Sequence, residues 1–250
     1  MKMVFDLDGT ICFKGKPLSE DMVQVLDSLV GQGHEIVFAS ARPIRDLLPI
    51  LPAHMQQFPM TGGNGAFVAT GGEIISTIHF DKQLADKIVR LLRTYEADYL
   101  VDSKWDYAYT GHNEHPIWRN VDPEQRAKNV PLDELNEIVK VVILHSLNEQ
   151  QLLEELQQLP LVIYIHGNEG IIDISPQGVD KWAGLQELSI EPQQYIAFGN
   201  DANDMSMFKH AMRSVCVGEH PALMQVATDK VVNEEQQVIL KIKELMLELD

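Results

Sequence analysis

Short apolar runs alternate with longer amphipathic stretches in the first part of the chain. MKMVFD, at residues 1–6, has the pattern of a buried strand, and residues 19–33 have that of a helix with Ser19 as N-cap and Gly33 beyond its end. HEIVFAS, at 34–40, is the next expected strand. Strands that alternate with helices in this way are typical of a parallel sheet.

The same alternation returns in the last part of the chain. YIAFG at 195–199 and SVCVG at 214–218 are expected strands, and helices are expected at 180–189, 205–210 and 234–249. We therefore predict an α/β fold with a doubly wound, mostly parallel, Rossmann-like core sheet and helices on both of its faces.

The middle of the chain departs from this rhythm. About 140 residues separate Ser40 from Lys181, far more than the roughly 30 of one βαβ unit. This segment contains two helical patterns and several short strand-like runs: residues 81–96 and 148–159 for the helices, and EIISTIHF, ADYLVDS, DYAYTG, IVKVVILHS, LVIYIHG and IIDIS for the strands. Such a segment predicts an α+β unit with an antiparallel sheet. We expect it to be a domain at 79–177, inserted into a core of residues 1–78 and 178–250.

The formal net charge of −17 argues against a nucleic-acid partner, because proteins that bind nucleic acid present a basic surface. An anionic substrate then needs a metal ion or a few well-placed cations in its site. No apolar stretch approaches the ~20 residues of a membrane span, and no signal-peptide pattern precedes the first strand. The chain has two cysteines, Cys12 and Cys216, far apart in sequence. We expect a cytoplasmic protein with reduced thiols and no membrane partner.

Three polar groups of residues follow expected strands of the core. Asp6 and Asp8 come after the first strand, Ser40 ends the second, and GNDAND occupies 199–204. Ligands of open α/β sheets bind at the carboxyl ends of the strands, so these groups are expected to meet at one edge together with Lys181. Taken singly, each has an ordinary explanation: the acids could bind a cation or cap a helix, and Ser40 could be a helix N-cap.

Five motifs occur in a fixed order along the chain: FDLDGT (5–10), FASARP (38–43), NGA (64–66), SPQGVDK (175–181) and FGNDANDMSMF (198–208). Together they resemble the haloacid dehalogenase-like superfamily, and the long insertion resembles the α+β cap of its Cof-type phosphatases (subclass IIB). The resemblance covers both core segments, whereas the sequence of the insertion matches no pattern of its own. It implies a phosphatase core with a cap that selects the substrate.

The resemblance also implies a role for each matching residue. Asp6 is then the nucleophile that takes the phosphoryl group as an aspartyl-phosphate, and Asp8 protonates the leaving alcohol and later activates water. Ser40 and Lys181 hold the phosphate, and Lys181 neutralises charge on both Asp6 and the phosphoryl group. The expected substrate contacts come from both core segments: Ser40, Ala41, Arg42, Asn64, Lys181 and Asn203.

The expected cofactor is Mg²⁺, a hard cation that binds through carboxylates, water and phosphate. The resemblance places Asp6 and the backbone carbonyl of Asp8 among its ligands. The family pattern G-D-x-x-N-D has an aspartate where this chain has Asn200. Either Asn200 binds weakly, or Asp201 takes the ligand role through a shifted turn, or the metal affinity is reduced. We expect Asp201 to be a ligand together with Asn200. We expect Asp204 to contact the ligands without binding the metal itself.

In the insertion, DSKWDYAYTGHNEH (102–115) is rich in aromatic, histidine and acidic residues, as a sugar-binding surface is. Candidates for substrate contact there are Trp105, Asp106, Tyr107 and His112, with aromatic packing in an exposed strand and loop as the alternative. The histidines of the insertion fit no zinc-binding spacing, so no second metal is expected.

We therefore predict a Mg²⁺-dependent phosphatase, a phosphoric monoester hydrolase that acts on a small phosphorylated metabolite such as a sugar phosphate or a phosphorylated cofactor. Two alternatives stay open. One is a phosphomutase of the same fold, which returns the phosphoryl group to its substrate. The other is a ligand-binding or regulatory protein that has lost turnover. Asn200 favours the last alternative, whereas the presence of Asp6, Asp8, Ser40 and Lys181 opposes it.

Overall fold

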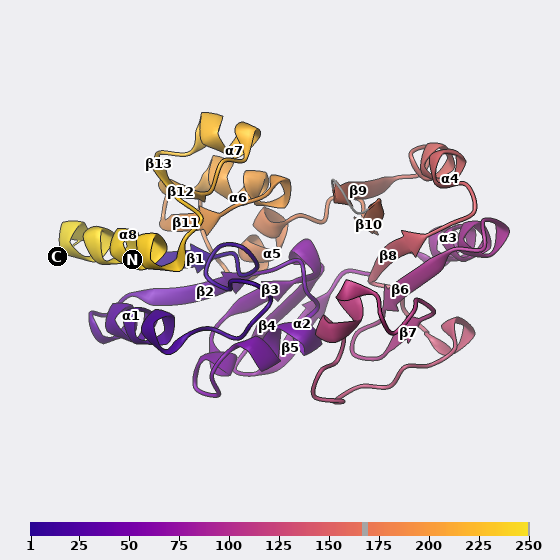
Figure 1. Cartoon of the computed structure of the whole chain (residues 1–250), viewed down its shortest axis with the longest axis horizontal. Coiled ribbons are helices and arrows are strands. Elements are labelled where there is room, and N and C mark those ends of the chain that lie inside the picture. The colour runs from indigo at the N-terminus through magenta and orange to yellow at the C-terminus, as the bar shows by residue number, and fades with distance from the viewer. Residues whose placement is uncertain (167–169, 250) are drawn as a thin grey trace. The chain divides into compact units, whose positions relative to one another are not determined.

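A computed structural model describes residues 1–166 and 170–249, and the chain forms two compact units (Figure 1). The core unit comprises Met1–Ser76 and Asp180–Asp250, and the cap unit is Thr77–Val179. The bounds expected from the sequence, 79 and 177, lie two residues inside the cap unit at each end. Gly167, the last residue of the run LVIYIHG, lies outside the described residues.

An eight-stranded sheet forms the centre of the core unit, in the order β13-β12-β11-β1-β2-β3-β4-β5. Neighbouring strands from β13 to β3 are parallel, and β3 and β4 are antiparallel. This confirms the mostly parallel α/β core. The strands are β1 (Lys2–Phe5), β2 (Glu35–Ala39), β3 (Met60–Gly62), β4 (Phe67–Thr70), β5 (Glu73–Thr77), β11 (Tyr195–Gly199), β12 (Arg213–Val217) and β13 (Asp229–Val231).

Helices cover both faces of this sheet. Successive side chains of a strand point to opposite faces, and both sets are therefore buried. Val4 packs in a cluster with α5, α6 and α7, while Met3 and Phe5 are buried as well. α1 and α8 pack side by side (Figure 1). Oγ of Ser19 accepts the amide of Met22 at 3.1 Å, which confirms the predicted N-cap. The helices are α1 (Glu20–Gly31), α2 (Ile44–Leu47), α5 (Lys181–Glu187), α6 (Met205–His210), α7 (Pro221–Val226) and α8 (Glu235–Leu249).

The cap unit is built around a five-stranded sheet in the order β7-β6-β8-β10-β9, whose neighbouring strands are antiparallel. α3 (Lys82–Thr94) and α4 (Glu149–Leu156) pack against Val101, Val141 and Ile174 on one face. This confirms the α+β insertion. Its strands are β6 (Asp98–Asp102), β7 (Tyr107–Tyr109), β8 (Lys140–His145), β9 (Leu161–His166) and β10 (Ile171–Pro176).

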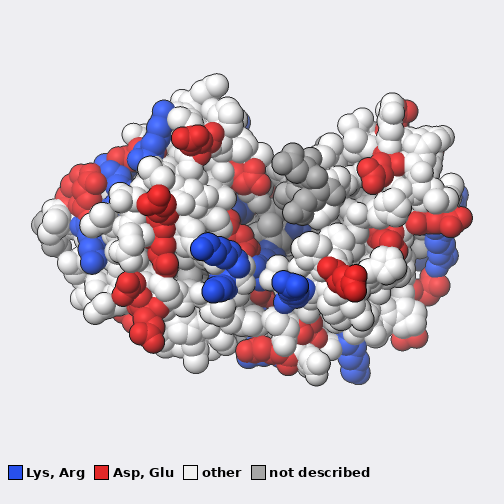
Figure 2. All heavy atoms as spheres, viewed as in Figure 1, with Lys and Arg blue, Asp and Glu red and all other residues white. Residues whose placement is uncertain are grey.

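Several short elements have no counterpart in the sequence-based prediction, namely β3, β4, β13, α2 and α7. Each has three to six residues, and elements this short are recognised less readily from their hydrophobic pattern. The run EIISTIHF is strand only over β5, which joins the core sheet. None of the helices described is long and apolar enough to cross a membrane. Asp and Glu side chains are scattered over the face drawn in Figure 2, in keeping with the net charge of −17.

Candidate active site

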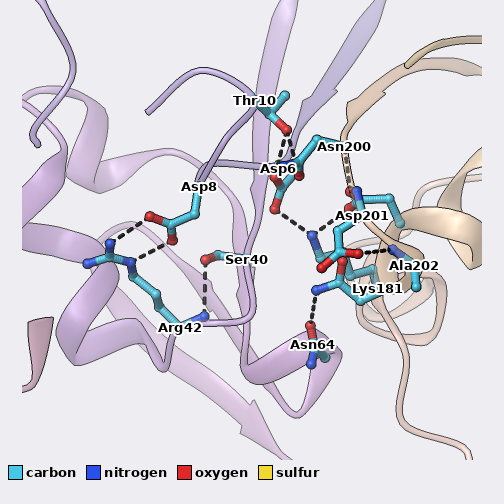
Figure 3. A network of polar contacts seen from close by, with 12 residues as sticks. Asp6, Asp8, Thr10, Ser40, Arg42, Asn64, Lys181, Asn200, Asp201 and Ala202 are labelled. Carbon is cyan, nitrogen blue, oxygen red and sulfur yellow. Dashed lines mark hydrogen bonds and ion pairs between the residues drawn. The ribbon is translucent and has the colours of Figure 1, made fainter. Parts of the chain in front are cut away.

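The polar groups expected at the strand ends lie at one edge of the core sheet (Figure 3). β1 lies between β2 and β11 and is parallel to both, so the segments that follow these three strands leave the sheet at the same edge. The segment after β1 supplies Asp6 and Asp8, that after β2 supplies Ser40 and that after β11 supplies Asn200. All these residues belong to the core unit.

Lys181 joins two buried carboxylates. It is the first residue of α5, whose N-cap is Asp180, and its side chain is fully buried. Its Nζ donates to Oδ1 of Asp6 at 2.6 Å and to Oδ1 of Asp204 at 2.6 Å. Two acids facing one ammonium group leave an excess of negative charge when both are ionised, and this charge is costly inside a protein.

The protonation of the site follows from this arrangement. Burial raises the pKa of Asp6 to about 7, although the charge of Lys181 acts in the opposite direction. Burial by itself would lower the pKa of Lys181, but the two carboxylates, Asp204 before Asp6, outweigh burial and raise it above its ordinary value. Lys181 therefore keeps its positive charge, while Asp6 gains or loses its proton near neutral pH.

Thr10 connects Asp6 to Asn200. Its Oγ1 donates to Oδ2 of Asp6 at 2.7 Å and lies 3.3 Å from Oδ1 of Asn200. Gly9 permits this approach, because a Cβ at that position would lie 2.2 Å from Nδ2 of Asn200. Its φ of +80° also belongs to the left-handed region that favours glycine. The amide oxygen of Asn200 is thus placed beside the carboxylate of Asp6.

The carboxylate of Asp201 is used differently. Asp201 is the N-cap of the 3₁₀ helix Ala202–Asp204, and its Oδ1 accepts the amide of Ala202 at 2.7 Å. The same oxygen lies 3.7 Å from Nε2 of His220. Oδ2 of Asp204 accepts the backbone amides of Asn200 and Asp201 at 2.8 and 3.0 Å. Asp204 therefore holds the loop together, while the side chain of Asp201 caps its own turn.

Asp8 pairs with Arg42 rather than with the Lys181 cluster (Figure 3). Nε of Arg42 donates to Oδ2 of Asp8 at 2.7 Å, and Nη2 donates to Oδ1 at 2.6 Å. The two carboxylates of FDLDGT therefore have separate cationic partners, Lys181 for Asp6 and Arg42 for Asp8.

Ser40 and Ala41 lead from β2 to Arg42. Ser40 is buried, and its Oγ accepts the amide of Arg42 at 3.1 Å, which leaves its hydroxyl proton for another acceptor. Ser40 is not a helix N-cap, because α2 begins after Pro43. The ordinary explanation offered by the sequence for this serine is therefore wrong.

The NGA motif forms a tight turn that contacts the GNDAND loop. Asn64 lies in the 3₁₀ helix Gly63–Gly65 with a φ of 58°, a conformation that asparagine tolerates better than most residues. Its Oδ1 accepts Nδ2 of Asn203 at 2.9 Å, and both side chains are buried. The two asparagines thus link the turn after β3 to the loop after β11.

The candidate residues of the cap unit take part in its local structure. Nε1 of Trp105 donates to the carbonyl of residue 126 at 2.8 Å, and Oδ1 of Asp106 accepts the amide of residue 128 at 3.0 Å. Tyr107 is buried in an apolar cluster, and the carbonyl of His112 accepts the hydroxyl of Tyr109 at 2.8 Å. These contacts are hydrogen bonds and apolar packing within the cap unit, and a role in substrate contact stays a prediction.

The oxygens of the site fit a hard divalent cation. Asp6 and Asn200 direct oxygens toward one hydroxyl, that of Thr10, and the acids around Lys181 outnumber its single charge. Within residues 1–166 and 170–249, no three His, Cys, Asp or Glu side chains gather so that they could hold a metal ion. A cation would therefore rest on few carboxylates together with neutral oxygens, as Mg²⁺ does when it keeps water and binds phosphate.

Two residues beside the site had no role in the sequence-based prediction. Thr10 ends the FDLDGT motif four residues after Asp6, so its place in the motif was a usable signal. His220, which follows β12, lies next to the carboxylate of Asp201, and no local sequence pattern predicts this contact.

Comparison with known proteins identifies the class to which this fold and site belong. Residues 3–241 match the haloacid dehalogenase-like hydrolase family, so the chain belongs to that family. Its resemblance to the Cof-type members, with structural neighbours in subclass IIB, is thereby confirmed. By family and by relatives it is a phosphatase, a phosphoric monoester hydrolase.

Similar proteins extend over nearly the whole chain. The 5-amino-6-(5-phospho-D-ribitylamino)uracil phosphatase YitU of Bacillus subtilis (strain 168) is 26% identical over 263 residues, with 97% of this chain and 96% of YitU covered. The phosphatase YbjI of Escherichia coli (strain K12), which bears the same activity name, is 22% identical, with 82% and 80% covered. The solved structure of the subclass IIB sugar phosphatase BT4131 has a TM-score of 0.80 at 17% identity, with 98% of this chain and 99% of that chain covered. This last likeness shows the fold alone.

Proposed function

We propose that the chain is a Mg²⁺-dependent phosphatase that hydrolyses a small phosphorylated metabolite, a sugar phosphate or a phosphorylated cofactor, through an aspartyl-phosphate. The observation that carries the proposal is the buried carboxylate of Asp6, held by Nζ of Lys181 at 2.6 Å, with Asp8 two residues further along. The substrate class is supported by the relatives YitU and YbjI, whose names describe a phosphorylated ribitylaminouracil as substrate.

The two acids divide the chemistry between them. In the first step an oxygen of Asp6 attacks phosphorus, and the bond between phosphorus and the leaving oxygen of the alcohol breaks. Asp8 gives a proton to this leaving oxygen. In the second step Asp8 takes a proton from water, whose oxygen attacks the phosphorus and releases inorganic phosphate and free Asp6. Lys181 and the hydroxyl of Ser40 stabilise the charge on the phosphoryl oxygens.

Mg²⁺ would be held by the carboxylate of Asp6, the amide oxygen of Asn200 and the backbone carbonyl of Asp8, and it would neutralise phosphate charge. We propose Asn200 in place of Asp201 as the ligand from the GNDAND loop. The amide oxygen of Asn200 lies 3.3 Å from the hydroxyl that also bonds Asp6, whereas the carboxylate of Asp201 caps a turn. The cap unit would select the leaving group and exclude water.

The test is release of inorganic phosphate from a panel of phosphomonoesters, with and without Mg²⁺, by the wild type and by Asp6→Asn. The panel contains hexose phosphates, ribitol phosphate, phosphoglycolate and flavin mononucleotide. Because Asp6→Asn removes the nucleophile but keeps its shape, we expect Mg²⁺-dependent release to fall by at least about 1,000-fold.

Three outcomes would contradict the proposal. Comparable release by pure Asp6→Asn would remove Asp6 as the nucleophile. Rearranged phosphorylated products without free phosphate would indicate a phosphomutase. Folded wild-type protein that binds these compounds without turning them over would indicate a ligand-binding or regulatory protein.

A further inference from the structure

Two N–H groups of the Arg42 guanidinium donate to one side chain, that of Asp8. The two hydrogen bonds are parallel, at 2.7 Å and 2.6 Å, one to each carboxylate oxygen. This fork geometry fixes both the distance and the plane of a carboxylate, which a lysine in the same place could not do. The pair joins residues 34 positions apart in sequence, so it belongs to the folded core and not to a local turn.

The backbone of Arg42 is also held on both sides. Its amide donates to Oγ of Ser40 at 3.1 Å, and its carbonyl accepts the amide of Gly63 at 2.7 Å. Gly62 lies so close that a Cβ there would be 2.6 Å from this carbonyl oxygen. The guanidinium therefore projects from a fixed point between the Ser40 segment and the turn after β3.

Exposure distinguishes the two partners. The side chain of Arg42 is 11% exposed, whereas that of Asp8 is 45% exposed. Burial acts to lower the pKa of Arg42, but the hydrogen bonds and charge of Asp8 outweigh it, so the guanidinium stays charged. Arg42 is thus the more buried partner of the pair, and part of the surface of the Asp8 side chain stays exposed.

We propose that Arg42 is a positioning residue that holds Asp8 in place for proton transfer and does not itself bind the substrate phosphate. The inference rests on the proposed function, in which Asp8 acts in both steps. When Asp8 carries the proton, its carbonyl oxygen still accepts from Arg42, and its O–H donates to the leaving oxygen. When it is ionised, the second hydrogen bond to Arg42 is restored, and the carboxylate is oriented to take a proton from water.

Dependence on the leaving group tests this role. An alkoxide needs a proton in order to leave, whereas p-nitrophenolate leaves unprotonated because its charge spreads into the nitro group. We therefore compare wild type, Arg42→Gln and Arg42→Lys on p-nitrophenyl phosphate and on the best alkyl phosphomonoester of the panel, with Mg²⁺ present. For Arg42→Gln we expect kcat on the alkyl ester to fall on the order of 100-fold, the fall on p-nitrophenyl phosphate to be at least about tenfold smaller, and KM to change less than about twofold. Arg42→Lys should be intermediate.

Asp8→Asn and the double variant Asp8→Asn/Arg42→Gln complete the cycle. If Arg42 acts through Asp8, the double variant hydrolyses the alkyl ester as slowly as Asp8→Asn alone. Equal losses on both esters with a raised KM would overturn the inference and make Arg42 a phosphate ligand. Additive losses in the double variant would overturn it as well.

Melting temperatures show whether each variant is folded, and if Arg42→Gln is not folded, the comparison is made with Arg42→Lys. Wild type without turnover of either ester would remove the proposed function, and this inference with it.

Discussion

Asn200 and Asp201 are neighbours in the chain, yet the structure uses their side chains in different ways. The amide oxygen of Asn200 lies beside Asp6 through Thr10, whereas the carboxylate of Asp201 is half-exposed and caps the turn that follows it. An amide oxygen can bind Mg²⁺ but brings no formal charge to the ion. The identity of the residue at position 200 should therefore set the affinity of the site for the metal.

Exchanging the amide at position 200 and the carboxylate at position 201 should therefore have different effects on Mg²⁺ binding. Asn200→Asp should tighten Mg²⁺ binding by at least about tenfold, because it adds a negative charge next to the ion. Asp201→Asn, the matched control, removes a charge of the same size from the neighbouring position and should change the affinity by less than about twofold. Isothermal titration with Mg²⁺ in the absence of substrate measures both. A larger effect of Asp201→Asn than of Asn200→Asp would restore Asp201 as the ligand.

The position of Lys181 depends on how closely α5 approaches the turn after β3. A Cβ on Gly65 would lie 2.0 Å from the carbonyl oxygen of Asp180, the N-cap of α5. On the helix side, a Cβ on Gly184 would lie 2.2 Å from Oγ1 of Thr61. Glycine on both sides thus lets the start of α5 meet the turn, and this contact places the ammonium group between its two acids.

Gly65→Ala should therefore be more harmful than an ordinary substitution at a positive φ. Gly33→Ala is the matched control, because Gly33 has a φ of +82° and a Cβ at that position would have no atom within 4 Å. We expect Gly33→Ala to cost about 1–2 kcal/mol of unfolding free energy and Gly65→Ala at least about 2 kcal/mol more, with reduced turnover. Thermal unfolding and phosphate release measure the two effects. Equal costs would mean that α5 yields to the added methyl group without strain.

For the molecule as a whole, the charge on Asp6 should appear in the pH dependence of stability. The pKa of Asp6 is raised from 3.8 to about 7 by burial, so between these values the folded protein holds a proton that the unfolded chain has lost. The contribution of this group to stability is then fully present below about pH 4 and is lost as the pH rises through about 7.

Melting temperatures of the wild type and of Asp6→Asn, measured in EDTA across this range, test the sign. The asparagine does not titrate, so the wild type should lose stability relative to Asp6→Asn as the pH rises from about 4 to about 7, by a few °C. Above that range the difference should stay constant. A constant difference throughout, or a relative gain by the wild type, would mean that the pKa of Asp6 is not raised in the folded protein.

Much of the fold could be predicted from the sequence. β2 contains a continuous apolar run, and the longer α1 has both a hydrophobic period and an N-cap. The meeting of the strand ends followed from the parallel order of β11, β1 and β2.

The orientation of side chains could not be predicted in the same way. Asp201 and Asn200 were both expected to be metal ligands, and we propose Asn200 alone, because Asp201 and Asp204 cap the turn between them. An acid followed three residues later by a second acid is itself a capping pattern, so the signal was present but competed with the family motif. The partner of Asp8 depends on a tertiary contact with Arg42 that no local pattern contains.

The position of Lys181 has a mechanical consequence as well as a chemical one. The chain leaves the cap unit at Val179 and re-enters the core at Asp180, and the next side chain is tied to Asp6 and Asp204. The end of the inserted chain is therefore fixed where it enters the core. Strain in the insertion, or a cap of different length, would change the chain before Asp180 and would leave Lys181 bonded to Asp6 and Asp204.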